Sequence, residues 1–505
     1  MKKKIIIAIK YILLLLLIVF LCVAVFSTNW AIDTFRFTSF EAVLFTLSAP
    51  FGSTSSELIS SYINNCLIKA LVISAIVFVI VLLLDNYFSG KRYDIYLKIK
   101  NKEFKHSIDG KKVRLGFKII CFLACLVVLG YCIVKMYIYE YFVDMFHPSP
   151  LVEDYYVNPD NVNITFPEEK RNLIYIYAES LESTFFSKDL GGYDENNYIE
   201  PLVDLTSKNI NFSDTDKFGG SIEVPGTGWT SAAMVAQTSG LPLKNSLQCI
   251  LGSATMLNGV SSLGNVLENN GYQQMLMIGS PKEFGNRGIY YSTHGNVEVY
   301  DYNTAIEKGK IDKDYYEWWG FEDSKLFEFS KEEITRMADK GTPFSFTLLT
   351  TNTHAQDGFI EDSCEIKFED NKYGNALYCS SQQIADFIGW IQEQDFYPNT
   401  TIILVGDHES MQNDIYPKNS RRRVYNLFIN SAIGTEYNHN REFTTMDLFP
   451  TTLASLGVNI EGDRLGLGTN LFTGKKTIME EIGKEEFEEE IEKYSKYYMD
   501  QFYHD

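Results

Sequence analysis

The chain has 505 residues, with 45 basic and 65 acidic side chains and a formal charge of −20. The charge is unevenly spread, because residues 1–138 hold 17 Lys and Arg against 7 Asp and Glu, and the remainder is strongly acidic. This distribution, with a hydrophobic share of 45%, excludes a disordered chain, a uniformly soluble protein and a basic protein that binds nucleic acid. Eight cysteines are too few for a disulfide scaffold of this length.

Long apolar stretches within residues 1–147 predict a transmembrane region with spans at about 5–27, 67–84 and 115–136. Each stretch is long enough to cross a bilayer, and buried core helices rarely lack charge over such a length. A cleaved signal peptide fits the first stretch less well, because its apolar run exceeds a usual signal region and no clear cleavage site follows.

Basic residues predict the orientation of these spans. Lys2, Lys3 and Lys4, and the Lys and Arg residues of segment 85–114, mark both segments as cytoplasmic. Three crossings then place the chain after Tyr139 outside. We therefore expect a multi-pass membrane protein whose domain after Tyr139 lies outside the cytoplasm. The half-apolar stretch 40–51 is expected at the membrane interface, since a fourth span would conflict with the charge distribution.

Cysteine usage allows one disulfide outside the membrane. Only Cys249, Cys364 and Cys379 lie in the part predicted to be outside, and the other cysteines fall in or beside the spans. An oxidising exterior permits one pair and leaves one cysteine over. We favour the pair Cys364 and Cys379, which flank a short loop, and reduced cysteines remain the alternative.

The pattern of the outer part of the chain predicts an α/β domain. Residues 148–171 are polar and predict a linker, residues 172–475 a catalytic domain, and residues 476–505 a charged C-terminal helix. Continuous apolar runs that alternate with helical patterns indicate a mostly parallel sheet sandwiched by helices. The apolar runs are 172–179, 274–279, 343–350 and 400–406.

Candidate site residues follow three of these runs. Glu179 ends the first run, His354 comes shortly after the third, and Asp407 and His408 follow the fourth. Because reactive groups in such folds gather beyond the C-terminal ends of the strands, these side chains could converge on a divalent cation. Taken singly, an acid after a strand is more often a helix N-terminal charge, and an Asp-His pair a turn or cap. Their joint placement favours the site.

A glycine-rich loop precedes another candidate. The segment 225–234 contains Gly226, Gly228, Trp229 and Thr230 and predicts a tight loop that enters a helix. Backbone N–H groups at a helix start can hold phosphate oxygens, and a hydroxyl placed on a metal ion can be deprotonated and attack phosphorus. The alternative is that Thr230 is a plain helix N-cap. The loop is not a Walker motif, because no Gly-Lys-Ser/Thr follows.

Together, these motifs resemble the phosphoglycerol transferase and lipoteichoic acid synthase group of the alkaline phosphatase/sulfatase superfamily. The likeness is closer to the phosphoglycerol transferases that decorate periplasmic glucans, and it spans about residues 172–471. The residues that carry it are Glu179, the stretch 226–242, the segments 284–287 and 292–295, His354 and the segment 406–408. The resemblance implies a sulfatase/alkaline-phosphatase-like fold. It also implies a place in the bacterial cytoplasmic (inner) membrane, with the catalytic domain periplasmic or extracellular.

The resemblance also implies the roles of individual residues. Glu179, Thr230, Asp407 and His408 would be the ligands of one divalent cation, and Thr230 would also be the nucleophile. The cation is expected to be Mn²⁺, although Mg²⁺ and Zn²⁺ also suit these ligands. 

Further residues would contact the substrate. His354 would contact the phosphoryl group or serve as acid-base, Arg287 would bind phosphate or glycerol, and Trp229 would also lie at the substrate. The synthase branch has a Trp near that Arg, where this chain has Gly285, which argues against the teichoic acid branch. His294 is a further possible contact, more typical of a structural residue.

The implied reaction moves a glycerophosphate group from phosphatidylglycerol to a hydroxyl of a glycan or glycolipid, through a glycerophospho-Thr230 intermediate. Phosphoethanolamine transfer, phosphodiester hydrolysis and a degenerate, non-catalytic binding domain are the alternatives. A sulfatase would need a Cys/Ser-x-Pro-x-Arg motif, which the sequence lacks. The Trp318-Trp319 pair is more typical of a core or rim, yet it could offer a stacking face for a sugar.

Overall fold

The computed structural model describes residues 2–35, 37, 39–48, 56–88, 92–99, 102–244, 256–412, 415–416 and 420–503. The chain forms two compact units. One comprises Met1–Phe40 and Thr54–Val143, and the other Glu41–Ser53 and Asp144–Asp505. Cys249 lies outside the described residues.

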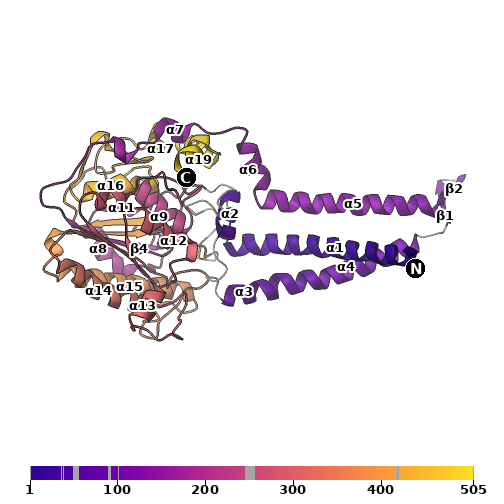
Figure 1. The fold of residues 1–505 in the computed structure, drawn as a ribbon, viewed down its shortest axis with the longest axis horizontal. Coiled ribbons are helices and arrows are strands. Elements are labelled where there is room, and N and C mark those ends of the chain that lie inside the picture. The colour runs from indigo at the N-terminus through magenta and orange to yellow at the C-terminus, as the bar shows by residue number, and fades with distance from the viewer. Residues whose placement is uncertain are drawn as a thin grey trace. The chain divides into compact units, whose positions relative to one another are not determined.

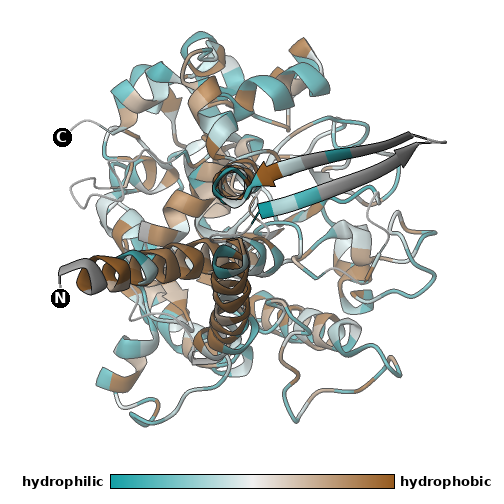
Figure 2. Ribbon diagram, turned by 90° about the vertical axis from the view of Figure 1, so that its right-hand side faces the viewer, coloured by the Kyte–Doolittle hydropathy of each residue, from teal (hydrophilic) through white to brown (hydrophobic). Residues whose placement is uncertain are grey.

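The N-terminal unit holds the predicted spans. Among the described residues, three helical segments are long and apolar enough to cross a membrane: Ile5–Phe35, Ile59–Tyr87 and Gly110–Lys135. In Figure 2 the helix that begins at the marked N-terminus is coloured mostly as hydrophobic. The three segments extend beyond the predicted spans because the polar residues at their ends continue the helices. The elements of this unit are α1 (Lys2–Phe35), α3 (Ser56–Tyr62), a π-helical turn (Ile63–Leu67), α4 (Ile68–Tyr87), β1 (Arg92–Ile99), β2 (Lys102–Asp109), α5 (Gly110–Lys135) and α6 (Ile138–Asp144).

The stretch expected at the membrane interface instead forms α2 (Phe40–Ser48), and from Glu41 onward it belongs to the second unit. Phe45 is buried in the apolar core of that unit, with its ring 5.8 Å from the ring of Trp229. Residues 49–51 lie outside the described part of the chain. Protein side chains thus cover part of the apolar face that the sequence assigned to lipid, and a location at the membrane interface stays a prediction.

The second unit is built around a mostly parallel sheet, which in the described residues has seven strands in the order β5-β10-β9-β4-β8-β6-β7. The four predicted apolar runs form β4, β6, β8 and β9, and these strands are parallel to their neighbours in the sheet except where β9 meets β10. The strands are β4 (Asn172–Ala178), β5 (Gly220–Ser221), β6 (Gln273–Ile278), β7 (Glu298–Tyr300), β8 (Phe344–Leu349), β9 (Thr400–Gly406) and β10 (Val424–Ile429). The predicted α/β fold class is thus confirmed.

Helices cover both faces of the sheet (Figure 1). The central strand β4 is buried on both faces, since Tyr175 and Tyr177 belong to one apolar core and Ile174 and Ile176 to the other. This explains why such strands read as continuous apolar runs. One face carries α9 (Thr230–Ser239), α11 (Leu263–Glu268), α12 (Arg287–Thr293) and α16 (Leu448–Ser455); the other carries α8 (Val203–Lys208), α13 (Tyr302–Glu307), α14 (Asp323–Ala338) and α15 (Lys372–Gln392).

The segment 148–171 is part of the domain and not the predicted linker. It contains α7 (Leu151–Tyr155), whose Leu151 and Val152 are buried in the core. It also contains β3 (Ile164–Thr165), which pairs with β11 (Asn459–Ile460). A few apolar residues widely spaced among polar ones suffice to anchor this segment, and they produce no periodic pattern.

The C-terminal segment is also more divided than predicted. In place of one charged helix, its described residues form α17 (Ile478–Ile482), α18 (Lys484–Glu492) and α19 (Lys496–Phe502). Gly483, with a φ of 92°, separates the first two helices. Phe487 and Tyr498 are buried in the core. The remaining short strands are β12 (Arg464–Leu465) and β13 (Gly468–Thr469).

A disulfide joins Cys364 to Cys379, the favoured pair, across a sequence separation of 15 residues. A loop of this size is stabilised by about 3 kcal/mol in the chain-entropy model. We expect the Cys364→Ser/Cys379→Ser variant to unfold at a lower temperature than the wild type, measured by thermal denaturation. Dithiothreitol should lower the melting temperature of the wild type and leave that of the variant unchanged. A Cys22→Ser variant is the matched control, and equal melting temperatures for all three would contradict the prediction.

Candidate active site

Neighbouring strands bring the predicted site residues to one edge of the sheet. Asp407 and His408 follow β9, Glu179 follows β4, and His354 lies in the loop after β8. Arg287 begins α12, which follows β6. Because β9, β4, β8 and β6 are adjacent and parallel, their C-terminal ends open toward the same place.

Four of the predicted residues meet at this edge. Glu179, Asp407 and His408 are buried, and each offers one ligand atom within 4.8 Å of the others. The Thr230 Oγ1 lies 3.5 Å from Glu179 Oε2 and 3.5 Å from His408 Nε2. The His408 Nε2 also lies 3.3 Å from Asp407 Oδ2. Two carboxylates, an imidazole and a hydroxyl thus surround one point.

The electrostatics of this cluster suit a divalent cation. Burial and the charge of Glu179 raise the pKa of Asp407. Burial alone would lower the pKa of His408, but the carboxylates of Asp407 and Glu179 outweigh it and raise that pKa. The Asp407 Oδ2 is buried and accepts no hydrogen bond from the described residues. A buried acceptor amid surplus negative charge fits a cation bound by Glu179, Asp407, His408 and Thr230.

Thr230 is the first residue of α9, and not its N-cap. The N-cap is Trp229, which is extended and makes no side-chain cap hydrogen bond. The plain N-cap alternative for Thr230 is therefore wrong, and its hydroxyl faces the carboxylate and imidazole instead. A side chain at position 228 of the preceding loop would displace the Glu223 carboxylate, because its Cβ would lie 2.5 Å from the Glu223 Oε1.

Hydrogen bonds hold the ligand loops together. Ser180, with a φ of 56°, donates its backbone N–H to Asp407 Oδ1 at 2.7 Å and its hydroxyl to Glu179 Oε1 at 2.8 Å. The Thr353 hydroxyl donates to the Glu179 carbonyl at 2.5 Å, and Gln237 Nε2 donates to the Asp407 carbonyl at 3.3 Å. The sequence analysis missed these positioning residues. Only the adjacency of Ser180 and Thr353 to predicted site residues could have signalled them.

His354 keeps one ring nitrogen available as an acceptor. Its Nδ1 lies 2.7 Å from the Ala355 carbonyl, an acceptor, so Nδ1 carries the proton and Nε2 is left as an acceptor. The start of α14 holds the residues that precede His354, because the Asp323 carboxylate accepts the backbone N–H of Thr351 at 2.7 Å and of Asn352 at 3.1 Å. Asp323 is a further positioning residue that the sequence analysis missed.

Arg287 is buried at the beginning of α12. It donates to the Ser280 hydroxyl at 2.7 Å and to the Phe284 carbonyl at 2.9 Å. Burial lowers the pKa of Arg287 to about 10, against the attraction of Glu179 and Asp407, so the guanidinium stays charged at neutral pH. A fixed cation that interacts with this carboxylate cluster suits a phosphate ester.

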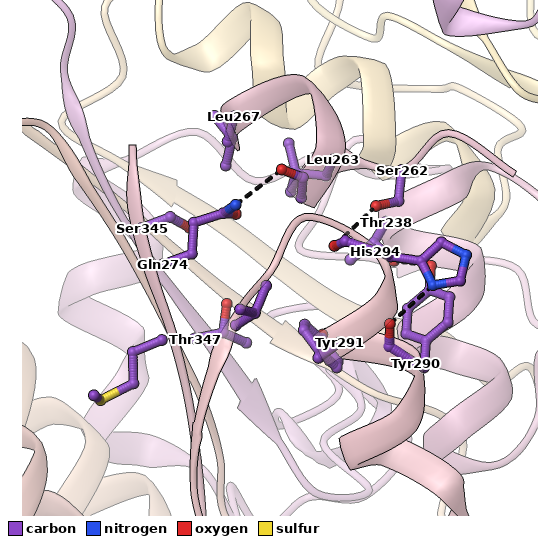
Figure 3. A pocket seen from close by; sticks show the side chains of 13 residues that line it. Thr238, Ser262, Leu263, Leu267, Gln274, Tyr290, Tyr291, His294, Ser345 and Thr347 are labelled. Atoms are coloured by element: carbon purple, nitrogen blue, oxygen red, sulfur yellow. Dashed lines mark hydrogen bonds between the residues drawn. The ribbon is translucent and has the colours of Figure 1, made fainter. Parts of the chain in front are cut away.

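The structure gives Trp229 and His294 structural contacts. The ring of Trp229 packs on Phe45, and a substrate contact for it stays a prediction. His294 lines a separate pocket between α11, α12 and the sheet (Figure 3). Its Nδ1 lies 2.8 Å from the Tyr290 carbonyl and its Nε2 2.9 Å from the Leu257 carbonyl, so both nitrogens are used by backbone.

The half-buried His354 should make stability depend on pH. Burial lowers the pKa of His354 from 6.5 to about 4, which exceeds the opposing effect of the Ala355 carbonyl. Between these values the unfolded chain binds a proton that the folded protein excludes, so stability falls as pH decreases from 6.5 to 4. The loss is at most about 3 kcal/mol, and less to the extent that water reaches the ring.

We therefore expect the melting temperature of a His354→Gln variant to fall less than that of the wild type over this pH window. An equivalent His439→Gln variant, at an exposed position, should follow the wild type. Parallel curves for all three proteins would contradict the assignment.

The sequence is similar to a known family and to characterised transferases. A family model described as Sulfatase matches residues 171–458. Phosphoglycerol transferase I of Salmonella choleraesuis (strain SC-B67) is 31% identical over 342 residues, which cover 64% of this chain and 41% of that protein. Phosphoglycerol transferase I of Escherichia coli O6:K15:H31 is 31% identical over 336 residues. The chain spans about two fifths of the length of these curated relatives.

Solved structures share the fold. The integral membrane protein lipooligosaccharide phosphoethanolamine transferase A from Neisseria meningitidis superposes with a TM-score of 0.52 at 12% identity, over 89% of this chain and 84% of its own. A protein of the alkaline phosphatase superfamily from Vibrio parahaemolyticus superposes with a TM-score of 0.50 at 18% identity, over 65% of this chain and 79% of its own. Because the family model covers more than half of a chain with this fold, the protein belongs to the Sulfatase family.

Proposed function

We propose that the protein is a membrane-anchored phosphoglycerol transferase, which moves a glycerophosphate group from phosphatidylglycerol to a hydroxyl of a glycan or glycolipid. The observation that carries the proposal is the Thr230 hydroxyl, held 3.5 Å from both Glu179 and His408 in a buried ligand set. The 31% identity to phosphoglycerol transferase I supports glycerophosphate as the transferred group.

The ligand set defines what a cation would contribute. A divalent cation, which we propose to be Mn²⁺, would be held by Glu179, Thr230, Asp407 and His408, and would lower the pKa of the hydroxyl and offset phosphoryl charge. Arg287 supplies a second, permanent positive charge for phosphate oxygens or glycerol hydroxyls.

The reaction then runs in two displacements. The Thr230 hydroxyl gives its proton to solvent as its oxygen bonds to phosphorus, the bond from phosphorus to the diacylglycerol oxygen breaks, and that oxygen takes up a proton from solvent as diacylglycerol leaves. This yields glycerophospho-Thr230. In the second displacement an acceptor hydroxyl attacks phosphorus and the bond to Thr230 breaks. His354 is neutral at pH 7 and keeps Nε2 as an acceptor, so we assign it the proton of the incoming hydroxyl.

The apolar helices keep this site near its lipid donor. We propose that the protein is multi-pass in the inner membrane, with the basic segment 85–114 cytoplasmic and the sulfatase-like domain outside. Phosphatidylglycerol in the outer leaflet would then be within reach, and the membrane would retain the diacylglycerol that is released.

The test uses the full-length protein in detergent micelles with Mn²⁺ and fluorescent phosphatidylglycerol or phosphatidylethanolamine. We expect diacylglycerol release from phosphatidylglycerol alone. Release from phosphatidylethanolamine alone would identify a phosphoethanolamine transferase. Release from neither lipid, by protein shown to be folded and metal-loaded, would contradict a transferase and favour a binding role.

A further inference from the structure

The ring of Trp319, in the segment between α13 and α14, lies beside the rings of His354 and Phe284. The Trp319 ring centroid is 4.7 Å from that of His354 and 5.4 Å from that of Phe284. Phe284 in turn lies under Arg287, whose guanidinium carbon is 5.1 Å from the ring centroid. Trp319 therefore connects the segment that carries His354 with the segment that carries Arg287.

The backbone around Trp319 is firmly held. Trp318 has a φ of 56°. This backbone conformation costs a bulky residue about 1 kcal/mol or more, so it persists only where surrounding contacts hold it in place. The Trp318 indole N–H donates to the Thr351 carbonyl at 3.0 Å, and the Trp318 ring stacks on Phe359 at 6.0 Å. Trp319 itself is only half-buried. The fold thus fixes Trp319 beside the site while leaving part of its side chain open to solvent.

A side chain at position 285 of the opposite segment would be strained. Gly285 has a φ of 63°, and a Cβ there would lie 2.5 Å from the Ser231 Oγ. Ser231 donates that hydroxyl to the Gly285 carbonyl at 2.7 Å and directly follows the nucleophile Thr230. A side chain at position 285 would have to displace the Ser231 hydroxyl, and it is Trp319 that supplies the aromatic ring beside His354.

We propose that Trp319 forms the acceptor subsite, and that its ring stacks against the apolar face of a pyranose sugar. This inference rests on the proposed transferase function. The flat ring of Trp matches the C–H face of a pyranose, whereas an open-chain polyol has no such face. A sugar stacked on Trp319 brings a hydroxyl toward His354, whose ring lies alongside.

In the transfer step His354 carries the proton from the sugar hydroxyl to the Thr230 oxygen. The sugar hydroxyl gives its proton to His354 Nε2 as its oxygen bonds to phosphorus. The bond from phosphorus to the Thr230 oxygen breaks, and the proton returns from His354 to that oxygen. Because the subsite is the flat ring of Trp319, the acceptor it selects is a pyranose-containing glycan or glycolipid.

The test compares two acceptors that differ in ring structure. Full-length protein in detergent micelles with phosphatidylglycerol receives either gentiobiose or sorbitol, and mass spectrometry quantifies the phosphoglyceryl products. For Trp319→Ala we expect kcat/KM for gentiobiose relative to sorbitol to fall about fivefold, mainly through KM for gentiobiose. Trp319→Phe should keep most of the preference. Trp390→Phe, at a half-buried Trp on α15, is the matched control and should match the wild type.

Distinct results would overturn the subsite. An unchanged ratio in Trp319→Ala would show that the ring does not recognise the sugar. An equal loss for both acceptors would make Trp319 a support for His354 alone. Wild-type protein that releases diacylglycerol without modifying gentiobiose would show that this face does not admit a pyranose. Failure of diacylglycerol release in the wild type would refute the transferase function itself.

Discussion

Replacement of Thr230 by Ala is expected to abolish diacylglycerol release, with a rate loss of about four to six orders of magnitude. The variant removes the hydroxyl oxygen, which lies 3.5 Å from Glu179 Oε2 and 3.5 Å from His408 Nε2. Stability should change little, since Thr230 is half-buried and its side chain does not cap α9. The measurement is the initial rate of diacylglycerol release from fluorescent phosphatidylglycerol by the full-length protein.

Thr230→Ser is the matched control for this result. It keeps the hydroxyl but frees its rotamer, so we expect a rate about tenfold below that of the wild type. Mass spectrometry of the wild type without acceptor should show a glycerophosphate adduct on the peptide that contains Thr230, and no adduct in Thr230→Ala. Undiminished release by Thr230→Ala, with the protein folded, would eliminate the covalent route.

Replacement of Asp407 by Asn should remove both the metal and the activity. Asp407 is fully buried; its Oδ1 accepts the backbone N–H of Ser180 at 2.7 Å, whereas its Oδ2 accepts no hydrogen bond from the described residues and is left for a cation. Loss of one anionic ligand from such a site should weaken Mn²⁺ binding by about 100-fold or more. Metal content by mass spectrometry, measured after dialysis of the full-length protein, reports this without reference to activity.

Two controls separate metal loss from general damage. Asp447→Asn alters another buried aspartate, whose carboxylate accepts the backbone N–H of Thr444 at 2.7 Å and of Thr469 at 2.8 Å. That variant should be less stable yet retain its metal. Chelator should inactivate the wild type, and added Mn²⁺ should restore it. Stoichiometric metal in Asp407→Asn would show that the cation lies elsewhere.

The strands that the sequence revealed share one property. β4, β6, β8 and β9 are largely buried and carry few polar residues, so each appears as an apolar run. The neighbouring strand β10 was missed because Asn426 interrupts its apolar pattern. That side chain is fully buried, where it accepts the Phe212 N–H at 2.9 Å and donates to the Phe212 carbonyl at 2.9 Å. A polar residue satisfied by a distant partner cannot be told from a surface residue in the sequence.

The residues of the candidate site also fall into those that the local sequence predicts and those that only the fold brings together. Glu179, Asp407 and His408 stand directly after apolar strands, so their place at a sheet edge was predictable from local pattern. Gln237 and Asp323 were not, because each acts through backbone groups of a segment that is remote in sequence. These contacts form only once α9 packs near the end of β9 and the start of α14 packs near the end of β8.

By itself the sequence determined the apolar spans, the class of the outer domain and the residue types at the strand ends. These are local properties, since they depend on hydrophobic periodicity and on the chemistry of neighbouring side chains. Only the tertiary structure decided that α2, segment 148–171 and the C-terminal helices belong to the domain core, and that Trp319 stands beside His354. Those outcomes depend on which surfaces the packed chain buries, a free-energy balance summed over residues far apart in sequence.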